Sequence, residues 1–167
     1  MSIEGIFQVT LILAVFLCSL AAGLLFTLAI VVMPGIRALN DREFIRAFQV
    51  IDGVIQNNQP VFMLVWVGSV IFLGLAAVLG IVHLDGIDRL LMIIAALVYL
   101  LGVQLPTARI NIPLNNELQS LNVDKMSETE QSEARKRFEP RWNRWNGIRA
   151  VLASLATGLL IILALRL

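Results

Sequence analysis

The segment IFQVTLILAVFLCSLAAGLLFTLAIVVM, residues 6–33, runs for 28 residues without a charged side chain. A helix needs about 20 apolar residues to cross the hydrocarbon core of a bilayer, so this segment is long enough to span a membrane. It is much longer than the apolar core of a cleaved signal peptide, about 7–15 residues, and no basic residue precedes it. We therefore expect a retained transmembrane helix here.

The composition of the whole chain points to the same class of protein. Its 167 residues are 58% hydrophobic and 15% charged, with a mean hydropathy of +0.82, whereas soluble domains carry about 25% charged residues. Together with three further apolar segments, the predicted spans are residues 6–33, 61–84, 88–106 and 146–166. We expect an all-α fold, an integral membrane four-helix bundle formed by a single domain, residues 1–167.

The basic residues predict the orientation of this bundle. Eleven of the thirteen lysines and arginines fall in the two long connections, and only Arg89 and Arg166 lie on the other side. The positive-inside rule then places both long connections in the cytoplasm and both termini outside, in a plasma or inner membrane. The net charge of +1 and the spread of these arginines show no nucleic-acid-binding patch.

The first connection has the pattern of an amphipathic helix over residues 41–58. Apolar residues recur at spacings of three and four and form one stripe, which consists of Phe44, Phe48, Ile51 and Ile55. Asp52 follows Phe48 by four positions, so its carboxylate points with the apolar set. We expect a helix along the membrane interface with one acidic residue on its apolar face.

The second connection, residues 107–145, begins with the amide-rich sequence TARINIPLNN, residues 107–116. This sequence follows directly on an apolar span and has a central proline. We expect a turn that is either tied to the protein or holds a ligand. A capping-box pattern at Ser127 predicts a charged cytoplasmic loop helix that ends near Phe138. Pro140 is then expected to restart the helix that becomes the fourth span.

The unusual polar and aromatic residues all map to one end of the predicted bundle. They are Asp52, Thr107, Arg109, Asn111, Asn115, Trp142, Trp145, Asn146 and Arg149, close to Pro34 and Gly35, which are expected to end the first span. An unpaired buried polar group costs about 1–3 kcal/mol. Either these groups satisfy one another, for example Asp52 with Arg109 or Arg149, or some of them line a ligand pocket.

The sequence gives little support for a metal or haem site. His83 is the only histidine, and no group of histidine, cysteine and carboxylate residues has the spacing of a zinc or iron site. Haem ligation by His83 with a methionine such as Met63, Met92 or Met33 is the weaker alternative. We expect no metal and no bound cofactor.

Four short motifs occur together and carry a resemblance. They are VVMPG at residues 31–35, NNQPVF at 57–62, NIPLNN at 111–116 and the Trp142-x-x-Trp145-Asn146-x-x-Arg149 pattern. In this order they resemble the anthrone oxygenase-like family of small four-helix membrane proteins, many of unknown function. The resemblance extends from about residue 20 to the C-terminus. It implies oxidation of an anthrone to an anthraquinone by molecular oxygen, without a conventional cofactor.

If the chain carries out this reaction, the residues at the cytoplasmic mouth of the bundle are the candidates for it, with Asp52 as the nearest possible base. Asp52 would be the catalytic base, while Asn111 and Arg149 would stabilise the developing oxyanion. A flat apolar substrate would enter from the lipid and contact a binding set made of Phe48, Thr107, Arg109, Asn115, Trp142, Trp145 and Asn146.

The alternative reading is a non-catalytic membrane protein for binding or assembly. Its polar cluster would be structural, and patterns such as Ser19-xxx-Gly23 would support a homo-oligomer.

Overall fold

The computed structural model describes residues 3–167 and confirms the all-α membrane bundle. In this part of the chain, four helices are long and apolar enough to cross a membrane: Ile3–Arg37, Pro60–His83, Gly86–Gln119 and Glu128–Arg166. They are called the first to fourth spans below. The labelled elements are α1 (Ile3–Thr27), α2 (Met33–Arg37), α3 (Asp41–Gln56), α4 (Pro60–His83), α5 (Gly86–Tyr99), α6 (Ile112–Gln119) and α7 (Glu128–Arg166).

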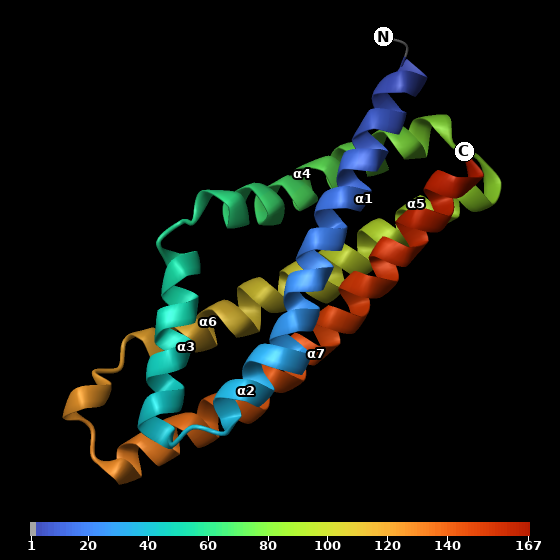
Figure 1. The fold of residues 1–167 in the computed structure, drawn as a ribbon. Helices are drawn as coiled ribbons and strands as arrows, with labels where there is room; N and C mark the ends of the chain where they lie inside the picture. The colour runs from blue at the N-terminus through green and yellow to red at the C-terminus, as the bar shows by residue number, and fades with distance from the viewer. Residues whose placement is uncertain (1–2) are drawn as a thin grey trace.

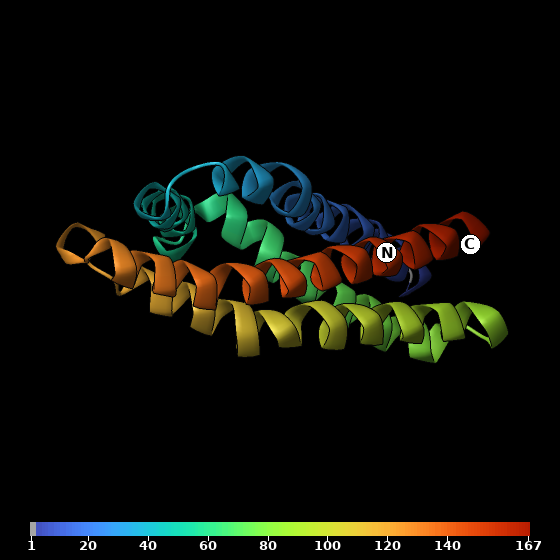
Figure 2. The same cartoon turned by 90° about the horizontal axis from the view of Figure 1, so that it is seen from below.

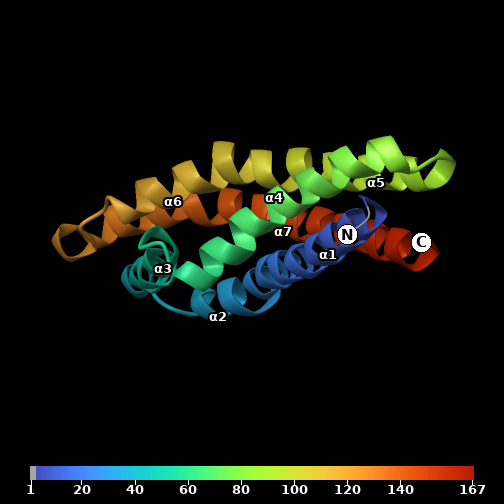
Figure 3. The ribbon, with the colours of Figure 1, turned by 90° about the horizontal axis from the view of Figure 1, so that it is seen from above.

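The four spans pack against one another in a bundle. The α1 helix contacts α4 and α7, and α5 contacts α7 and α4. Figures 2 and 3 show the third span lying beside α7 over much of its length. The α3 helix lies across one end of the bundle, which we call the α3 end (Figure 1).

Small side chains fill the space between the spans. Those without exposed surface include Ala14, Cys18 and Ala21 of α1, Ala76 of α4, Ala95 of α5, and Ala153 and Ala156 of α7. Residues of this size let helix backbones approach closely, which is how helices associate in lipid. Large apolar side chains such as Phe16, Leu64 and Val151 are exposed on the outside. An exposed apolar surface of this kind is suited to contact with lipid tails.

Four prolines lie inside the spans without ending them, and a widened π-helical turn precedes three of these. The π turns are Leu28–Val32, Leu100–Gln104 and Thr107–Asn111, and they precede Pro34, Pro106 and Pro113. In each case the residue just before the proline donates its backbone N–H to the carbonyl oxygen five residues back. A proline has no N–H and its ring clashes with the carbonyl four residues back. The wider turn relieves the clash and keeps the helix continuous.

Two predicted boundaries are therefore wrong. Pro34 and Gly35 do not end the first span, which continues to Arg37. The amide-rich sequence over residues 107–116 is not a turn but part of the continuous third span. Its amide side chains therefore occupy fixed positions on a helix.

The predicted separation between the loop helix and the fourth span is also wrong. α7 runs without interruption from Glu128 to Arg166, with Pro140 in its interior. Phe138 and Trp142 flank this proline and are both buried in a cluster with Phe44 and Phe48 of α3. Packing on both sides of Pro140 stabilises the helical path that a proline alone disfavours.

The predicted amphipathic helix is present as α3, and its apolar stripe faces the protein. Phe44 and Phe48 are buried, and Phe48 contacts Phe138 and Trp142 edge to face at centroid distances of 4.5 and 5.3 Å. Asp52 is on the same face and is only 3% exposed. The helical periodicity thus placed this carboxylate correctly inside the protein.

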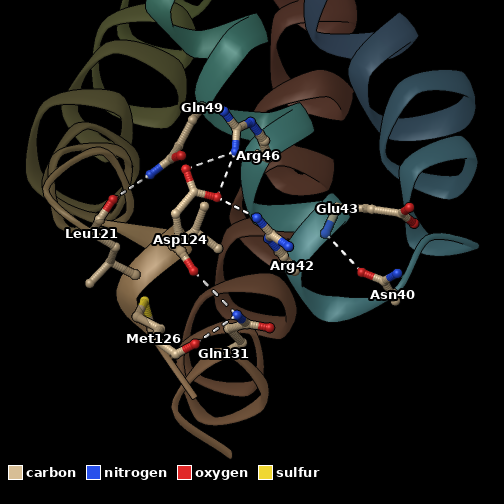
Figure 4. Close-up of polar contacts among 10 residues, drawn as sticks. Asn40, Arg42, Glu43, Arg46, Gln49, Leu121, Asp124, Met126 and Gln131 are labelled. Carbon is tan, nitrogen blue, oxygen red and sulfur yellow. Dashed lines mark hydrogen bonds and ion pairs between the residues drawn. The ribbon is translucent and has the colours of Figure 1, made fainter. Parts of the chain in front are cut away.

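The connection between α6 and α7 is fixed to α3 by charged and polar contacts (Figure 4). Arg42 and Arg46 donate to the Asp124 carboxylate at 2.6 and 2.8 Å, and Gln49 donates to the carbonyl oxygens of Leu118 and Leu121. The two guanidinium groups hold the pKa of Asp124 below its usual value. All of these ionic contacts are exposed, so we assign them to positioning of the connection and not to global stability.

We expect Asp124→Asn to loosen this connection while leaving thermal unfolding of the bundle almost unchanged. Because the pKa of Asp124 is lowered in the folded state, the contact is complete above the ordinary aspartate value and is lost only as the pH falls through the lowered value. The loosening is measured as faster amide hydrogen exchange of residues 120–127 in the variant than in the wild type at each pH. Glu133→Gln is the control, and equal exchange in all three proteins would contradict the assignment.

Candidate functional site

The α7 helix presents Trp142, Asn146 and Arg149 on one buried face. The Arg149 side chain donates from Nη1 to the Thr107 hydroxyl at 2.8 Å and from Nη2 to the Asn146 carbonyl oxygen at 2.9 Å. Its guanidinium carbon lies 6.0 Å from the centroid of the Trp142 ring. Asn146 in turn donates to the backbone carbonyl of Leu25 at 3.1 Å. The cation is thus held by α1, α7 and the third span.

No carboxylate in the described part of the chain pairs with Arg149, which is only 4% exposed. Its two hydrogen-bond acceptors are both neutral. Proteins normally bury a charge only when it is paired, because removing it from water costs several kcal/mol. The site therefore carries an excess positive charge inside the bundle.

Asn111 is the second unusual group. It is 2% exposed, and neither its side-chain oxygen nor its nitrogen has a partner among residues 3–167. The Nε atom of Arg149 is unpaired in the same way. Each unsatisfied buried polar group costs about 1–3 kcal/mol, and such groups are few in folded proteins. Three of these atoms belong to Asn111 and Arg149, which makes this place the candidate functional site.

Both groups line a cavity of about 250 Å³. Its polar side consists of Thr107, Asn111, Asn115, Trp142 and Arg149, and its apolar side consists of Leu24, Leu25, Leu28, Ile55, Phe62, Met63, Trp66 and Ile112. Figure 1 shows α4 and α6 separating toward the α3 end, where this cavity lies. A mostly apolar pocket with a few convergent polar groups is the usual form of a small-molecule site.

Two aromatic rings of α4 form one wall of the cavity. Phe62 and Trp66 are one helical turn apart and stack at a centroid distance of 5.7 Å and an interplanar angle of 10°. We did not predict these two residues as part of the site. Their spacing of four puts them on one face of a helix, but only the packed structure shows that this face meets Arg149.

Asp52 lies behind the cavity and not in its lining. Its Oδ1 accepts from the Asn115 side-chain amide at 2.7 Å, while Gln56 and Gln119 donate to its Oδ2 at 2.7 and 3.1 Å. The expected pairing of Asp52 with Arg109 or Arg149 is therefore wrong. Three neutral amides satisfy the carboxylate, two of them from glutamines that we had not assigned to the site.

Asn115 joins this carboxylate to the cavity. Its side-chain oxygen accepts from the indole nitrogen of Trp142 at 2.7 Å, while its nitrogen donates to Asp52. The amide is therefore oriented at both ends. The arrangement fixes Trp142 against Arg149. Asn115 lies between Asp52 and the cavity.

The remaining predicted site residues divide into two groups. Phe48 packs behind Trp142, and Asn146 holds Arg149 from behind, so both support the cavity without lining it. Arg109 and Trp145 lie elsewhere and line a separate groove between the third span and α7. His83 is at the opposite end of α4 from the cavity, beside Glu4 and Gln8.

We expect Asp52→Ala to lower the free energy of unfolding by roughly 1.5–3 kcal/mol, the range for hydrogen bonds to a charged group. The substitution leaves the amides of Asn115, Gln56 and Gln119 without their acceptor. Thermal unfolding in detergent measures the loss. Glu43→Gln, on the exposed face of the same helix, is the control. Equal midpoints for both variants would show that Asp52 does not anchor the site.

Comparison with known proteins agrees with the sequence motifs. No curated protein and no solved structure matches the chain. Residues 60–159 match the model of a family described as anthrone oxygenase. The match covers more than half of the chain and includes Asn111, Asn115, Trp142 and Arg149, whereas Asp52 lies outside it. The chain therefore belongs to the anthrone oxygenase family.

Proposed function

We propose that the cavity binds a flat apolar molecule with one acidic C–H group and an oxygen atom conjugated to it, as in an anthrone. We further propose that the protein promotes oxidation of this molecule by molecular oxygen. One observation carries the proposal: Asn111 and Arg149, which each have a buried polar atom without a partner among the described residues, line the same mostly apolar cavity. Family membership supports the reaction class.

The chemistry follows from where negative charge develops. Loss of the C–H proton from an anthrone gives an anion whose charge resides largely on the ring oxygen. Arg149 Nε and the Asn111 side-chain nitrogen have no acceptor among the described residues, and both residues line the cavity, so we assign them as the donors to that oxygen. In an apolar site such preoriented donors stabilise developing charge much more than water does. The stacked rings of Phe62 and Trp66 offer an apolar surface for the flat ring system.

The reaction balances with oxygen as the only oxidant. The carbanion transfers electrons to O₂ and a carbon–oxygen bond forms, giving a peroxide anion that takes up one proton. The second C–H proton is then removed, the O–O bond breaks and water leaves. A carbonyl group remains. One CH₂ group and one O₂ molecule thus give one C=O group and one water molecule.

Asp52 acts in this proposal as a positioning residue and not as the base. Both of its oxygens accept hydrogen bonds from amides, and neither lines the cavity. A general base must reach the proton directly or through one water, and Asn115 stands in between. The first proton therefore goes to a water-derived base, at a C–H group made more acidic by Arg149.

The cavity volume restricts the ligand. Small-molecule pockets usually measure about 300–1,000 Å³, so a cavity of about 250 Å³ is at the small end. It suits one compact ring system and excludes long substituents. Such a ligand is soluble in the lipid core, and we propose that it enters between the spans from the membrane.

The direct test is oxygen consumption by purified protein in detergent with an anthrone at neutral pH. We expect oxygen uptake and quinone absorbance to rise together, and the Asn111→Ala/Arg149→Ala double variant to reduce the catalysed rate to the uncatalysed one. Wild-type protein that is no faster than this double variant, with anthrones or related phenols, would overturn the proposal.

A second variant separates a functional Asn111 from a structural one. Because its amide has no partner, Asn111→Leu removes an unsatisfied group and should leave thermal stability unchanged or slightly higher. The rate should fall by about 100-fold or more, as when one oxyanion donor is removed elsewhere. Ser120→Ala, at the exposed position that directly follows the same span, is the control. A clear loss of stability in Asn111→Leu with the rate retained would favour the structural role.

A further inference from the structure

A second cavity of about 590 Å³ lies between the third span and α7, on a different side from the first. It is a lateral groove lined by Leu101, Gly102, Leu105, Pro106, Arg109, Ile110, Trp145, Ile148 and Leu152. Leu101 and Leu105 are 59% and 47% exposed, so the groove opens on the surface suited to lipid contact. We call it the lateral groove.

The shape of the lateral groove depends on Gly102. A Cβ atom at this position would lie 2.6 Å from Cδ1 of Leu152, so a larger residue would require the Leu152 side chain to shift. Gly102 is part of the π turn Leu100–Gln104, which precedes Pro106. Gly102 and Leu152 thus lie close together in the wall of the groove.

The charges around the lateral groove are all positive. Seven of the eleven arginines pair with a carboxylate, and among the described residues the four without such a partner are Arg109, Arg141, Arg144 and Arg149. Arg149 faces the first cavity. Arg109 lies in the groove itself. No acidic residue lines the groove.

The other two unpaired arginines are on the α7 face that continues the groove. Arg141 and Arg144 precede Trp145 and Ile148 by four positions, which places them one turn farther along the same side of the helix. Both are exposed. The apolar groove thus leads to three exposed arginines that no carboxylate of the described chain neutralises.

We propose that the lateral groove binds one anionic glycerophospholipid, with an acyl chain along Leu101, Leu105 and Leu152 and the phosphate at Arg109. An apolar channel in the lipid-facing surface that ends at unpaired arginines has the charge and polarity pattern of such a lipid. Trp145 lies beside Arg109, and tryptophans are typical of the depth at which lipid headgroups begin. A zwitterionic lipid carries its own cationic group beside the phosphate, so its headgroup is attracted less strongly by the unpaired arginines.

This site adjoins the first cavity without being part of it. Arg109 is in the π turn Thr107–Asn111, whose first and last residues line the first cavity. A phosphate at Arg109 would therefore hold the same turn from the opposite side.

The test is native mass spectrometry of purified protein after equilibration with an equal mixture of a phosphatidylglycerol and a phosphatidylcholine of identical chains. We expect at least fivefold more bound anionic lipid than zwitterionic lipid in the wild type. Arg109→Gln should reduce this preference at least threefold, and Arg109→Gln with Arg144→Gln should abolish it. Arg37→Gln removes an arginine that does not line the groove and is the charge-matched control.

Leu101→Trp gives an independent test, because a larger apolar side chain fills the groove without changing charge. We expect it to reduce binding of both lipids, while circular dichroism and gel filtration show a folded protein. Unchanged lipid preference in Arg109→Gln, or unchanged lipid binding in Leu101→Trp, would overturn the proposal. So would a wild-type dimer that Leu101→Trp dissociates, since the groove would then hold a second copy of the chain.

Discussion

The side-chain amide of Asn115 connects the parts of the site that lie on different helices. It donates to Asp52 on α3 and accepts from Trp142 on α7, both at 2.7 Å. A carboxamide can donate and accept at once, which neither a carboxylate nor a hydrocarbon can do. Because this amide and two glutamines satisfy Asp52, the carboxylate is not available to Arg149. The unpaired cation in the cavity is thus a consequence of how Asp52 is bonded.

The π turns explain how an amide-rich segment comes to lie on a continuous helix. The turn Thr107–Asn111 keeps the helix intact before Pro113. It therefore places Thr107 and Asn111 on a rigid element, where a loop would leave them mobile. Widened turns of this kind often occur at functional sites.

Local sequence patterns predicted the elements whose structure depends on local forces. The charge-free run over residues 6–33 predicted a span, and the 3.6-residue period around Phe48 predicted that Asp52 is buried. The same reasoning failed at Pro34 and Pro113, where the preceding turn widens, and at Pro140, where the helix continues without a π turn because residues on both sides of the proline are packed. Both outcomes depend on the surrounding packing, which is not visible in a local pattern.

The composition of the site shows a similar limit. Trp142 and Trp145 are three positions apart and were both expected to contact the substrate, but Trp142 lines the first cavity and Trp145 lines the lateral groove. The position of the neighbouring helix determines which residues of α7 lie on each side of the contact. The wall formed by Phe62 and Trp66 was missed for the same reason, since it depends on the direction in which α4 leaves the bundle.

The energetics of Arg149 follow from its surroundings. Its partners Thr107 and Asn146 are neutral acceptors, and the groups across the cavity are aromatic or aliphatic. In such a medium the attraction between opposite charges is many times stronger than in water. A ligand that becomes an anion in the cavity gains this attraction in full, whereas its neutral form gains only a hydrogen bond. In the reaction proposed above, Arg149 would therefore favour the deprotonated form of the ligand over its neutral form.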